Sequence, residues 1–276
     1  MFTACGGSAS KEDGPGTDAC NLLSSRAKII NGTTCETRQS AVVRIDIDRS
    51  SCTGTLITPS QVLTAAHCVF DITSSSTIRR GTISPSLMAV FSADSQLPIA
   101  LVTKVTAHPD FPTDFIRVSD VFDRSDSIDE FVSGVLSNGL ADLAVLDLDR
   151  SLNIIPQPIA VSQTPVFGQL FGIFGFGATD GEDPFATASL NSGRMSVRTV
   201  GRDNLVAVFE DGGSNTCFGD SGGPALNTTG VPSIIGTTAL GSTTNCAPGE
   251  VSLFTLLSSP RLGNFIRRVA PLAEFE

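Results

Sequence analysis

Residues 217–224 have the sequence CFGDSGGP, in which a serine is flanked by glycines and follows an acid. Small neighbours on a tight turn leave a serine hydroxyl exposed, so Ser221 is a candidate nucleophile. The backbone N–H groups of Gly219 and Ser221 are candidate donors to one developing oxyanion. Gly, Asp, Ser and Pro also form ordinary turns, so this segment alone is equally compatible with a surface loop.

A serine nucleophile needs a base, which is usually a histidine held in one tautomer by a buried carboxylate. The chain has only two histidines, His67 in the segment LTAAHC and His108 in the segment AHP. Residues 140–148, LADLAVLDL, supply an acid within an apolar run, and Asp142 and Asp147 are both candidates.

These three motifs, in the order His67, Asp142, Ser221, make the chain resemble the chymotrypsin/trypsin family of serine proteases. The resemblance extends from Ile29 to the C-terminal region. It implies that Ser221 attacks the substrate, His67 transfers the proton and Asp142 orients the imidazole. It also assigns the oxyanion hole to the N–H groups of Gly219 and Ser221.

The same resemblance indicates which aspartate and which histidine belong to the catalytic site. The family pattern DIALL matches residues 142–146, so Asp147 and Asp149 are expected on the solvated side or at the end of that strand. An Ala-His-Pro step is common in the family before the loop that leads to the aspartate, so His108 is expected to be a packed or surface residue.

The elements that position these residues are predicted to be mostly strands. Short apolar or alternating runs lie between turn signals at 41–47, 54–57, 87–91, 99–105, 143–148, 169–176, 233–238 and 251–256. Ser259-Pro260 followed by apolar residues at helical spacing predicts a C-terminal helix. The family resemblance implies an all-β fold of two packed six-stranded antiparallel β-barrels, with a leader at residues 1–28 and the protease domain at 29–276.

Composition points to an exported protein without nucleic-acid partners. The formal net charge of −10 opposes binding to nucleic acid or anionic membranes, and no later run is long and apolar enough to cross a bilayer. Seven cysteines together with the family motifs indicate an oxidising compartment, so the protein is expected to be secreted, periplasmic or at the cell surface. We expect a monomer that uses no metal or organic cofactor.

The family pattern implies the disulfides Cys52–Cys68 and Cys217–Cys246. The usual second-barrel partner of Cys35 is lacking, so we infer a Cys20–Cys35 bond that keeps the leader attached after cleavage. Cys5 is then left over. Residues 2–7 resemble the lipobox of bacterial lipoproteins, followed by a flexible tether, but residues 1–4 do not supply the charged and apolar stretches of an export signal. A lipid anchor at Cys5 and a spare thiol both stay open.

Residues 25–32, SRAKIING, resemble the activation site of the family. Cleavage after Lys28 would free the α-amino group of Ile29, which in the family pairs with the acid before the nucleophile, here Asp220. A buried carboxylate without a partner is costly, so this pairing would order the loop that carries Ser221. The intact chain is therefore expected to be a weakly active zymogen.

The family pattern places Asn215 at the floor of the primary specificity pocket, where trypsin-like members have an aspartate. Thr216 lies beside it, Gly241 is expected near the entrance, and either Ser252 or Glu250 on the wall. Without a floor carboxylate the pocket is expected to prefer uncharged residues before the scissile bond. An inward-facing Glu250 would restore a preference for basic residues. Lys28 fits an uncharged pocket poorly, so a separate trypsin-like protease is the expected activator.

The segment between His108 and Asp142 is longer than is usual in the family and rich in Asp. It is interpreted either as a lid over the cleft or as a tolerated surface loop.

The chain as a whole is predicted to be a serine endopeptidase that acts on protein or peptide substrates. The alternative is a catalytically silent relative that only binds. The order His, Asp, Ser excludes an α/β-hydrolase, in which the serine comes first.

Overall fold

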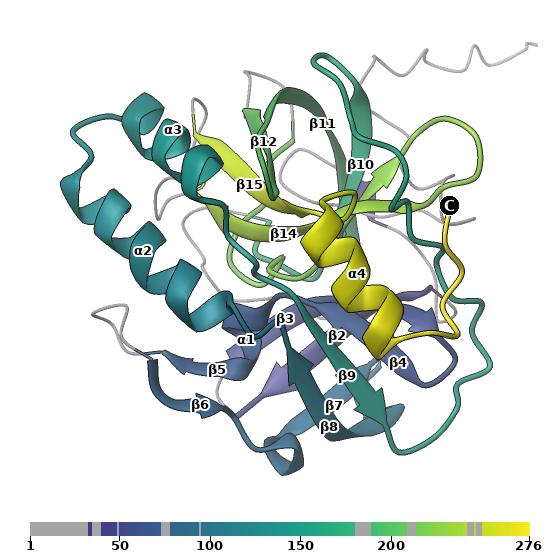
Figure 1. Ribbon diagram of the computed structural model, residues 1–276. Coiled ribbons are helices and arrows are strands. Elements are labelled where there is room, and N and C mark those ends of the chain that lie inside the picture. Colours follow the sequence, from purple (N-terminus) through teal and green to yellow (C-terminus); the bar gives the residue numbers. More distant parts are fainter. Residues whose placement is uncertain are drawn as a thin grey trace, which may run out of the picture.

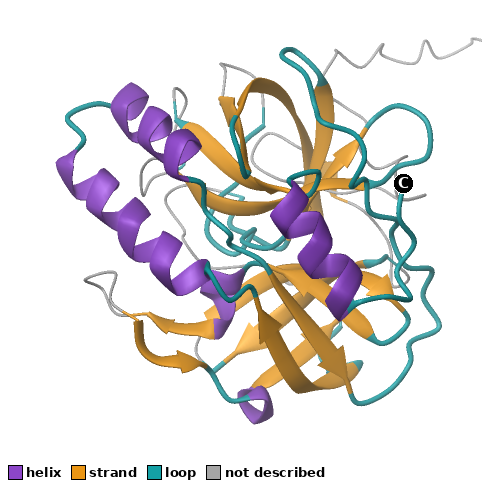
Figure 2. Cartoon of the chain, viewed as in Figure 1, coloured by secondary structure: helices purple, strands orange, loops and turns teal. Residues whose placement is uncertain are grey.

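The computed structural model consists of two β-barrels packed on one another, with helices along one side (Figures 1 and 2). The structure describes residues 33–34, 40–48, 50–72, 78–93, 95–179, 189–208, 214–241, 246 and 250–276. The expectations for Cys5, Cys20, Lys28, Ile29 and Cys35 therefore lie outside the described residues.

Six antiparallel strands form the first barrel, which is closed in the order β2-β3-β4-β9-β8-β7. They are β2 (Val42–Ile47), β3 (Ser50–Thr58), β4 (Gln61–Thr64), β7 (Met88–Phe91), β8 (Ala100–Ala107) and β9 (Ala144–Leu148). Beside them lie the short helix α1 (Ala66–Val69), the hairpin β5 (Phe70–Ile72) and β6 (Ile78–Thr82), and the turn η2 (Pro85–Leu87). Along β2, Ile45 and Ile47 are buried while Arg44 and Asp46 are half-buried, as expected when alternate side chains face a core.

The second barrel consists of β10 (Leu170–Gly175), β11 (Asn191–Val200), β12 (Asn204–Val208), β13 (Pro224–Asn227), β14 (Ile234–Gly241) and β15 (Val251–Leu256). Strand β12 pairs with both β15 and β11, which closes this ring of six antiparallel strands. The short strand β1 (Thr33–Thr34) pairs with the first two residues of β11. The predicted two-barrel fold is confirmed.

Helix α4 (Pro260–Val269) is the expected C-terminal helix and joins the two barrels. Its residues Leu262, Phe265 and Ile266 are buried in one cluster with Leu63 of β4 and Phe174 of β10. Pro260 occupies the first helical turn, where a missing backbone N–H costs nothing. None of the helices in the described part of the chain has the length and apolar character needed to cross a bilayer.

The long segment before Asp142 is a helical hairpin, where the sequence led us to expect a loop. Its helices are α2 (Phe111–Arg124) and α3 (Ile128–Asn138). Ser127 caps α3 by accepting a hydrogen bond from the Glu130 N–H (3.2 Å), and Gly139 ends it with a φ of 74°. The hairpin is built into the fold because its apolar face is buried against strands.

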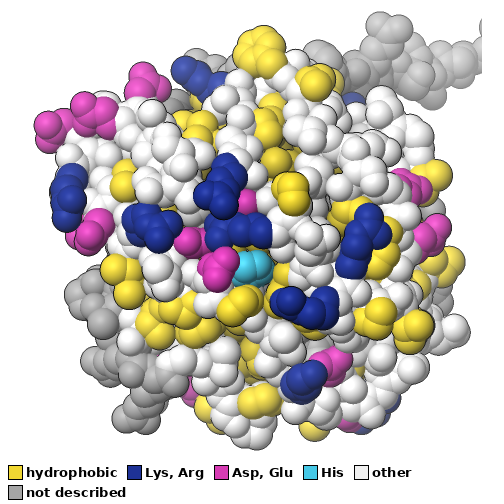
Figure 3. Space-filling view, in the orientation of Figure 1, with side chains coloured by type: hydrophobic (Ala, Val, Ile, Leu, Met, Phe, Trp, Pro, Cys, Tyr) yellow, Lys and Arg dark blue, Asp and Glu magenta, His cyan; other side chains and the backbone are white. Residues whose placement is uncertain are grey.

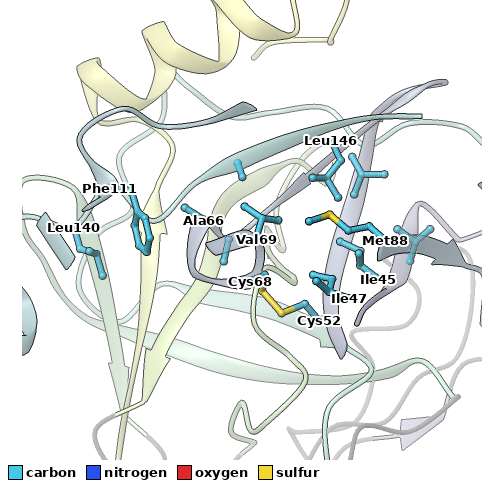
Figure 4. Close-up of a cluster of buried hydrophobic side chains, with 14 of the residues drawn as sticks. Ile45, Ile47, Cys52, Ala66, Cys68, Val69, Met88, Phe111, Leu140 and Leu146 are labelled. Carbon is cyan, nitrogen blue, oxygen red and sulfur yellow. A yellow bond between two sulfur atoms is a disulfide. The ribbon is translucent and has the colours of Figure 1, made fainter. Parts of the chain in front are cut away.

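Phe111 links this hairpin to the core of the first barrel. Its fully buried ring contacts Phe70 and Phe115, with centroids 5.0 and 5.3 Å away. Figure 4 shows Phe111 and Leu140 beside the same hydrophobic cluster that holds Val69 and the Cys52–Cys68 disulfide. The start of α2 is thus part of the core near His67.

Removing the Phe111 side chain tests this role of the hairpin. Phe111→Ala is expected to lower the free energy of unfolding by about 3–5 kcal/mol, because it removes buried area and leaves a cavity. Ile116→Ala in the same helix is the control, since Ile116 is 53% exposed. Its cost should stay within about 0.5 kcal/mol. Urea denaturation of both variants measures the difference, and equal costs would contradict a buried start of α2.

Candidate active site

The ends of two paired strands bring His67 and Asp142 together. Strand β4 pairs with β9, with Thr64 opposite Ala144. His67 lies in α1 just after β4, and Asp142 lies just before β9. The Nδ1 atom of His67 is 2.6 Å from Oδ2 of Asp142, and the His67 backbone N–H donates to Oδ1 at 2.8 Å. Both carboxylate oxygens are therefore satisfied by one residue.

This contact fixes the protonation of the imidazole. A carboxylate only accepts hydrogen bonds, so Nδ1 of His67 carries the hydrogen and Nε2 is left as the basic nitrogen. Burial by itself lowers the pKa of His67, but the charge and hydrogen bond of Asp142 outweigh it and raise the pKa above 6.5. Asp142 itself has no exposure to solvent.

His67 and Ser221 line one cavity, which has a volume of about 290 Å³. Asn215 also belongs to its lining. The described contacts include no hydrogen bond between Ser221 Oγ and His67 Nε2. Such a bond is often long in a free enzyme and shortens when substrate binds. The second barrel thus supplies the serine, and the first supplies the histidine and the acid.

The loop around Ser221 has the backbone that its glycines predict. Gly219 and Gly222 have φ values of 96° and 80°, which L side chains rarely adopt. A side chain at Gly222 would also collide with Thr64 and with the Thr53 carbonyl. The Gly223 N–H donates to the Asp220 carbonyl at 2.8 Å, which makes this a tight turn.

Asp220 is buried beside the serine. Its carboxylate accepts hydrogen bonds from the backbone N–H groups of Gly177 and Cys217, each at 2.9 Å. Burial nevertheless raises the pKa of Asp220 to about 7, and these two hydrogen bonds only partly oppose it. Among the contacts of the described residues, no cation pairs with this carboxylate.

The structure contains the two expected disulfides in the described part of the chain. Cys52–Cys68 joins β3 to the helix that carries His67, and Cys217–Cys246 lies beside the serine loop. The sulfur atoms of Cys52 and Cys68 lie near His67 in a cluster with metal-like spacing. Because both sulfurs are committed to the disulfide, neither offers the thiolate that a metal would need.

The expected specificity residues all line the cavity: Asn215, Thr216, Gly241 and Ser252. The Ser252 hydroxyl donates to Asn215 Oδ1 at 2.7 Å and lies 2.7 Å from the Thr216 hydroxyl. Glu250, the alternative wall residue, lines the same cavity and is 5% exposed. Phe218 and Thr238 also line the cavity, and the sequence assigned neither of them to the pocket, although the predicted strand at 233–238 ends at Thr238.

The histidine and the two aspartates that the sequence analysis set aside do not belong to the described lining of the cavity. His108 is buried, with its ring 4.9 Å from that of Phe265. Asp147 accepts a hydrogen bond from Gln61, and Asp149 forms an exposed ion pair with Arg150. None of the described residues that line this cavity belongs to α2 or α3. The interpretation of the hairpin as a lid over the wider cleft stays a prediction.

Comparison with known proteins identifies the family. The family model named Trypsin matches residues 29–260, so the chain belongs to the trypsin family of serine proteases. Rat submandibular glandular kallikrein-9 is 24% identical over 217 residues, which cover 73% of this chain and 75% of the kallikrein.

Other similarities are shorter or more distant. Serine proteases 1 and 2 of Drosophila melanogaster are each 40% identical over 53 residues, so the matched part spans only 20% of their length and 19% of this chain. The structure of neuropsin, described as a serine protease expressed in the limbic system of mouse brain, superimposes with a TM-score of 0.59. It covers 89% of this chain and 98% of neuropsin at 20% identity, which shows a common fold.

The two histidines are expected to titrate on opposite sides of pH 6.5. Asp142 raises the pKa of His67, whereas burial lowers the pKa of His108 and outweighs the opposite effect of Asp110. NMR titration of the imidazole resonances measures both values, and His108→Ala assigns them.

In Asp142→Asn the burial remains but the negative charge is lost, so the pKa of His67 should fall below 6.5. The pKa of His108 should stay unchanged. A His67 pKa that is already below 6.5 in the unmodified protein would contradict the described pairing.

Proposed function

We propose that the chain is an exported serine endopeptidase that hydrolyses peptide bonds through Ser221, His67 and Asp142. The observation that carries the proposal is the 2.6 Å contact between His67 and the buried Asp142 at the cavity that Ser221 also lines. Membership of the trypsin family supports a peptidase, and the complete triad argues against a catalytically silent relative.

The geometry supports the usual sequence of steps for such a triad. Ser221 Oγ attacks the substrate carbonyl carbon while its proton passes to Nε2 of His67. Asp142 stabilises the resulting imidazolium, and the N–H groups of Gly219 and Ser221 donate to the oxyanion. His67 then protonates the leaving amine, and water hydrolyses the acyl-enzyme by the same route. These steps use only groups of the chain and water.

We assign the protease domain to residues 29–276 and the leader to residues 1–28. The start of the family match at residue 29 and the pairing of β1 with β11 support this boundary. Disulfides persist in oxidising compartments, which supports export. The Cys20–Cys35 bond, the lipid anchor at Cys5 and the monomeric state remain proposals from the sequence.

Activation is proposed to follow cleavage after Lys28 by a trypsin-like protease. The environment of Asp220 supports this, because a buried carboxylate with a pKa of about 7 is stabilised strongly by a new cation. The α-amino group of Ile29 would supply that cation. The pairing would hold the loop from Phe218 to Ser221 in its active form.

The pocket is proposed to accept uncharged side chains. Asn215, Thr216 and Ser252 form a hydroxyl and amide network that holds no charge. Glu250 at the same cavity favours a second candidate specificity, for Arg or Lys before the scissile bond. A carboxylate that faces the substrate would provide the ion pair that the floor lacks.

A peptide library tests both the function and the specificity. The protein cut after Lys28 is expected to cleave peptides, mainly after uncharged residues, and Ser221→Ala should lower kcat by about 10⁶-fold. Mass spectrometry of the products gives the cleavage sites.

Glu250→Gln is the matched variant for specificity, because it keeps the size of the side chain and removes its charge. An unchanged cleavage profile is expected if the pocket selects uncharged residues. If the unmodified enzyme prefers Arg or Lys and this preference is lost in Glu250→Gln, the second specificity is correct. Equal rates for Ser221→Ala and the unmodified enzyme would contradict the proposed function.

The buried Asp220 predicts how the stability of the intact chain depends on pH. Its folded pKa of about 7 lies above the ordinary 3.8, so its contribution to stability is full below 3.8 and is lost as pH rises to 7. Asp220→Asn removes this titration. Relative to Asp220→Asn, the intact chain should therefore lose up to about 4 kcal/mol of unfolding free energy between pH 4 and pH 8.

Urea denaturation at several pH values gives this difference. Any effect of the Asp220→Asn substitution that does not depend on pH cancels when the two pH profiles are compared. After cleavage at Lys28 the new ammonium should lower the Asp220 pKa, so the pH-dependent difference should shrink or reverse. Parallel pH profiles of the intact protein and intact Asp220→Asn would contradict the activation proposal.

A further inference from the structure

Thr53 connects the first barrel to the serine loop of the second. It lies in β3 and is fully buried. Its hydroxyl donates a hydrogen bond to the Gly219 carbonyl at 2.7 Å, and its backbone N–H donates to the Ser221 carbonyl at 2.9 Å. One residue of the first barrel thus binds the carbonyl groups of both residues whose N–H groups would form the oxyanion hole.

The hydroxyl is also an acceptor. The backbone N–H of Phe176, just after β10, donates to Thr53 Oγ1 at 3.0 Å. The single hydrogen and a lone pair of the hydroxyl are therefore both used, which fixes its orientation. Without the hydroxyl, the half-buried Gly219 carbonyl and the buried Phe176 N–H would each lose this partner.

The serine loop needs such an anchor because its glycines do not restrain the backbone. Gly219 has a φ of 96° and no side chain that could hold the peptide groups on either side. Binding the Gly219 carbonyl fixes the plane of the peptide that follows it. The direction of the Gly219 N–H then depends only on the φ and ψ torsions of Gly219 itself.

We propose that the Thr53 hydroxyl is a positioning group for the oxyanion hole, acting through the Gly219 carbonyl. The inference rests on the proposed proteolytic function for its kinetic consequences, but the restraint on the loop is a property of the folded chain. Thr53 does not touch the reacting atoms. It sets the direction of the Gly219 N–H before substrate arrives, and preorganised donors stabilise an oxyanion more than mobile ones.

Thr53→Val removes the hydroxyl and keeps the shape of the side chain, while Thr53→Ser keeps the hydroxyl. Thr55→Val in the same strand is the matched control, because Thr55 is equally buried and its hydroxyl has no hydrogen-bond partner. Thr53→Ala provides a smaller variant in case valine prevents folding. All variants are made in the full chain.

Amide hydrogen exchange of the full chain tests the restraint directly. Exchange in the peptide that covers residues 217–223 should become several-fold faster in Thr53→Val and Thr53→Ala. It should be unchanged in Thr53→Ser and Thr55→Val. Unchanged exchange in Thr53→Val and Thr53→Ala overturns the proposal, whether or not the chain is a protease.

Kinetics of protein cut after Lys28 test the consequence for catalysis. In Thr53→Val, kcat should fall about tenfold with KM changed less than about twofold, since the loss concerns the transition state. A peptide aldehyde is the probe for the oxyanion. Ser221 Oγ adds to its carbonyl carbon, the Oγ proton passes to His67, and the aldehyde oxygen enters the hole as an oxyanion. Its affinity should fall in parallel with kcat.

The outcomes separate the two proposals. A fall in kcat that Thr53→Ser shares equally, or a change confined to KM, overturns the role of the hydroxyl. If the unmodified enzyme and Ser221→Ala are equally inactive, the proposed function fails, and hydrogen exchange still decides whether Thr53 restrains the loop.

Discussion

The burial of the Asp142 carboxylate is the constraint on which the candidate site depends. A carboxylate with no exposure is costly unless hydrogen bonds satisfy it, and here the backbone N–H and Nδ1 of His67 do so. The Asp142 carbonyl in turn accepts from the Thr255 hydroxyl of β15 at 3.0 Å. Asp142 therefore contacts both barrels, and the orientation of His67 depends on how the barrels pack.

The segment that leads into Asp142 is held by α2 and by β12 of the second barrel. The Ala141 N–H donates to Asp114 of α2, and the Leu140 N–H donates to Asn204. Asp114 is itself buried and pairs with Arg261 of α4 at 2.7 Å. Arg261 also lies 2.9 Å from the buried Asp203. The face that bears α2, α3 and α4 accordingly shows basic and acidic side chains close together (Figure 3).

This network gives the helical hairpin a structural role in the site. A hairpin that only decorated the surface would expose its charges to water. Instead α2 places one carboxylate where it binds both the backbone before Asp142 and an arginine of the C-terminal helix. The described contacts thus connect the insertion to the site through the backbone that leads into Asp142.

The sequence predicted the parts of the fold that have strong local patterns. Strands such as β2 and β15 and the helix α4 are marked by apolar periodicity and by Pro260, and the structure contains them. The hairpin was missed because its Asp-rich sequence was compared with a loop of the family. A helical signal was present, since Phe111, Phe115 and Val118 recur at helical spacing and are all buried.

The residues of the candidate site also differ in how well the local sequence predicts them. His67, Asp142 and Ser221 could be predicted from short motifs, because each role requires particular neighbours in the chain. The contact between Thr53 and Gly219 joins residues separated by 166 positions, so no local sequence pattern predicts it. Glu250, by contrast, was one of the two residues that the family pattern offered for the pocket wall, and both of them line the cavity.

The serine loop is held by constraints of different kinds. Thr53 binds its backbone from the first barrel, and the Cys217–Cys246 disulfide tethers its start within the second. These contacts fix atoms without balancing charge. The Asp220 carboxylate accepts two N–H groups, yet burial raises its pKa to about 7, so its charged form is less favoured than that of an exposed aspartate. A cation delivered to Asp220 would supply the charge balance that these contacts lack, in addition to the restraints that they provide.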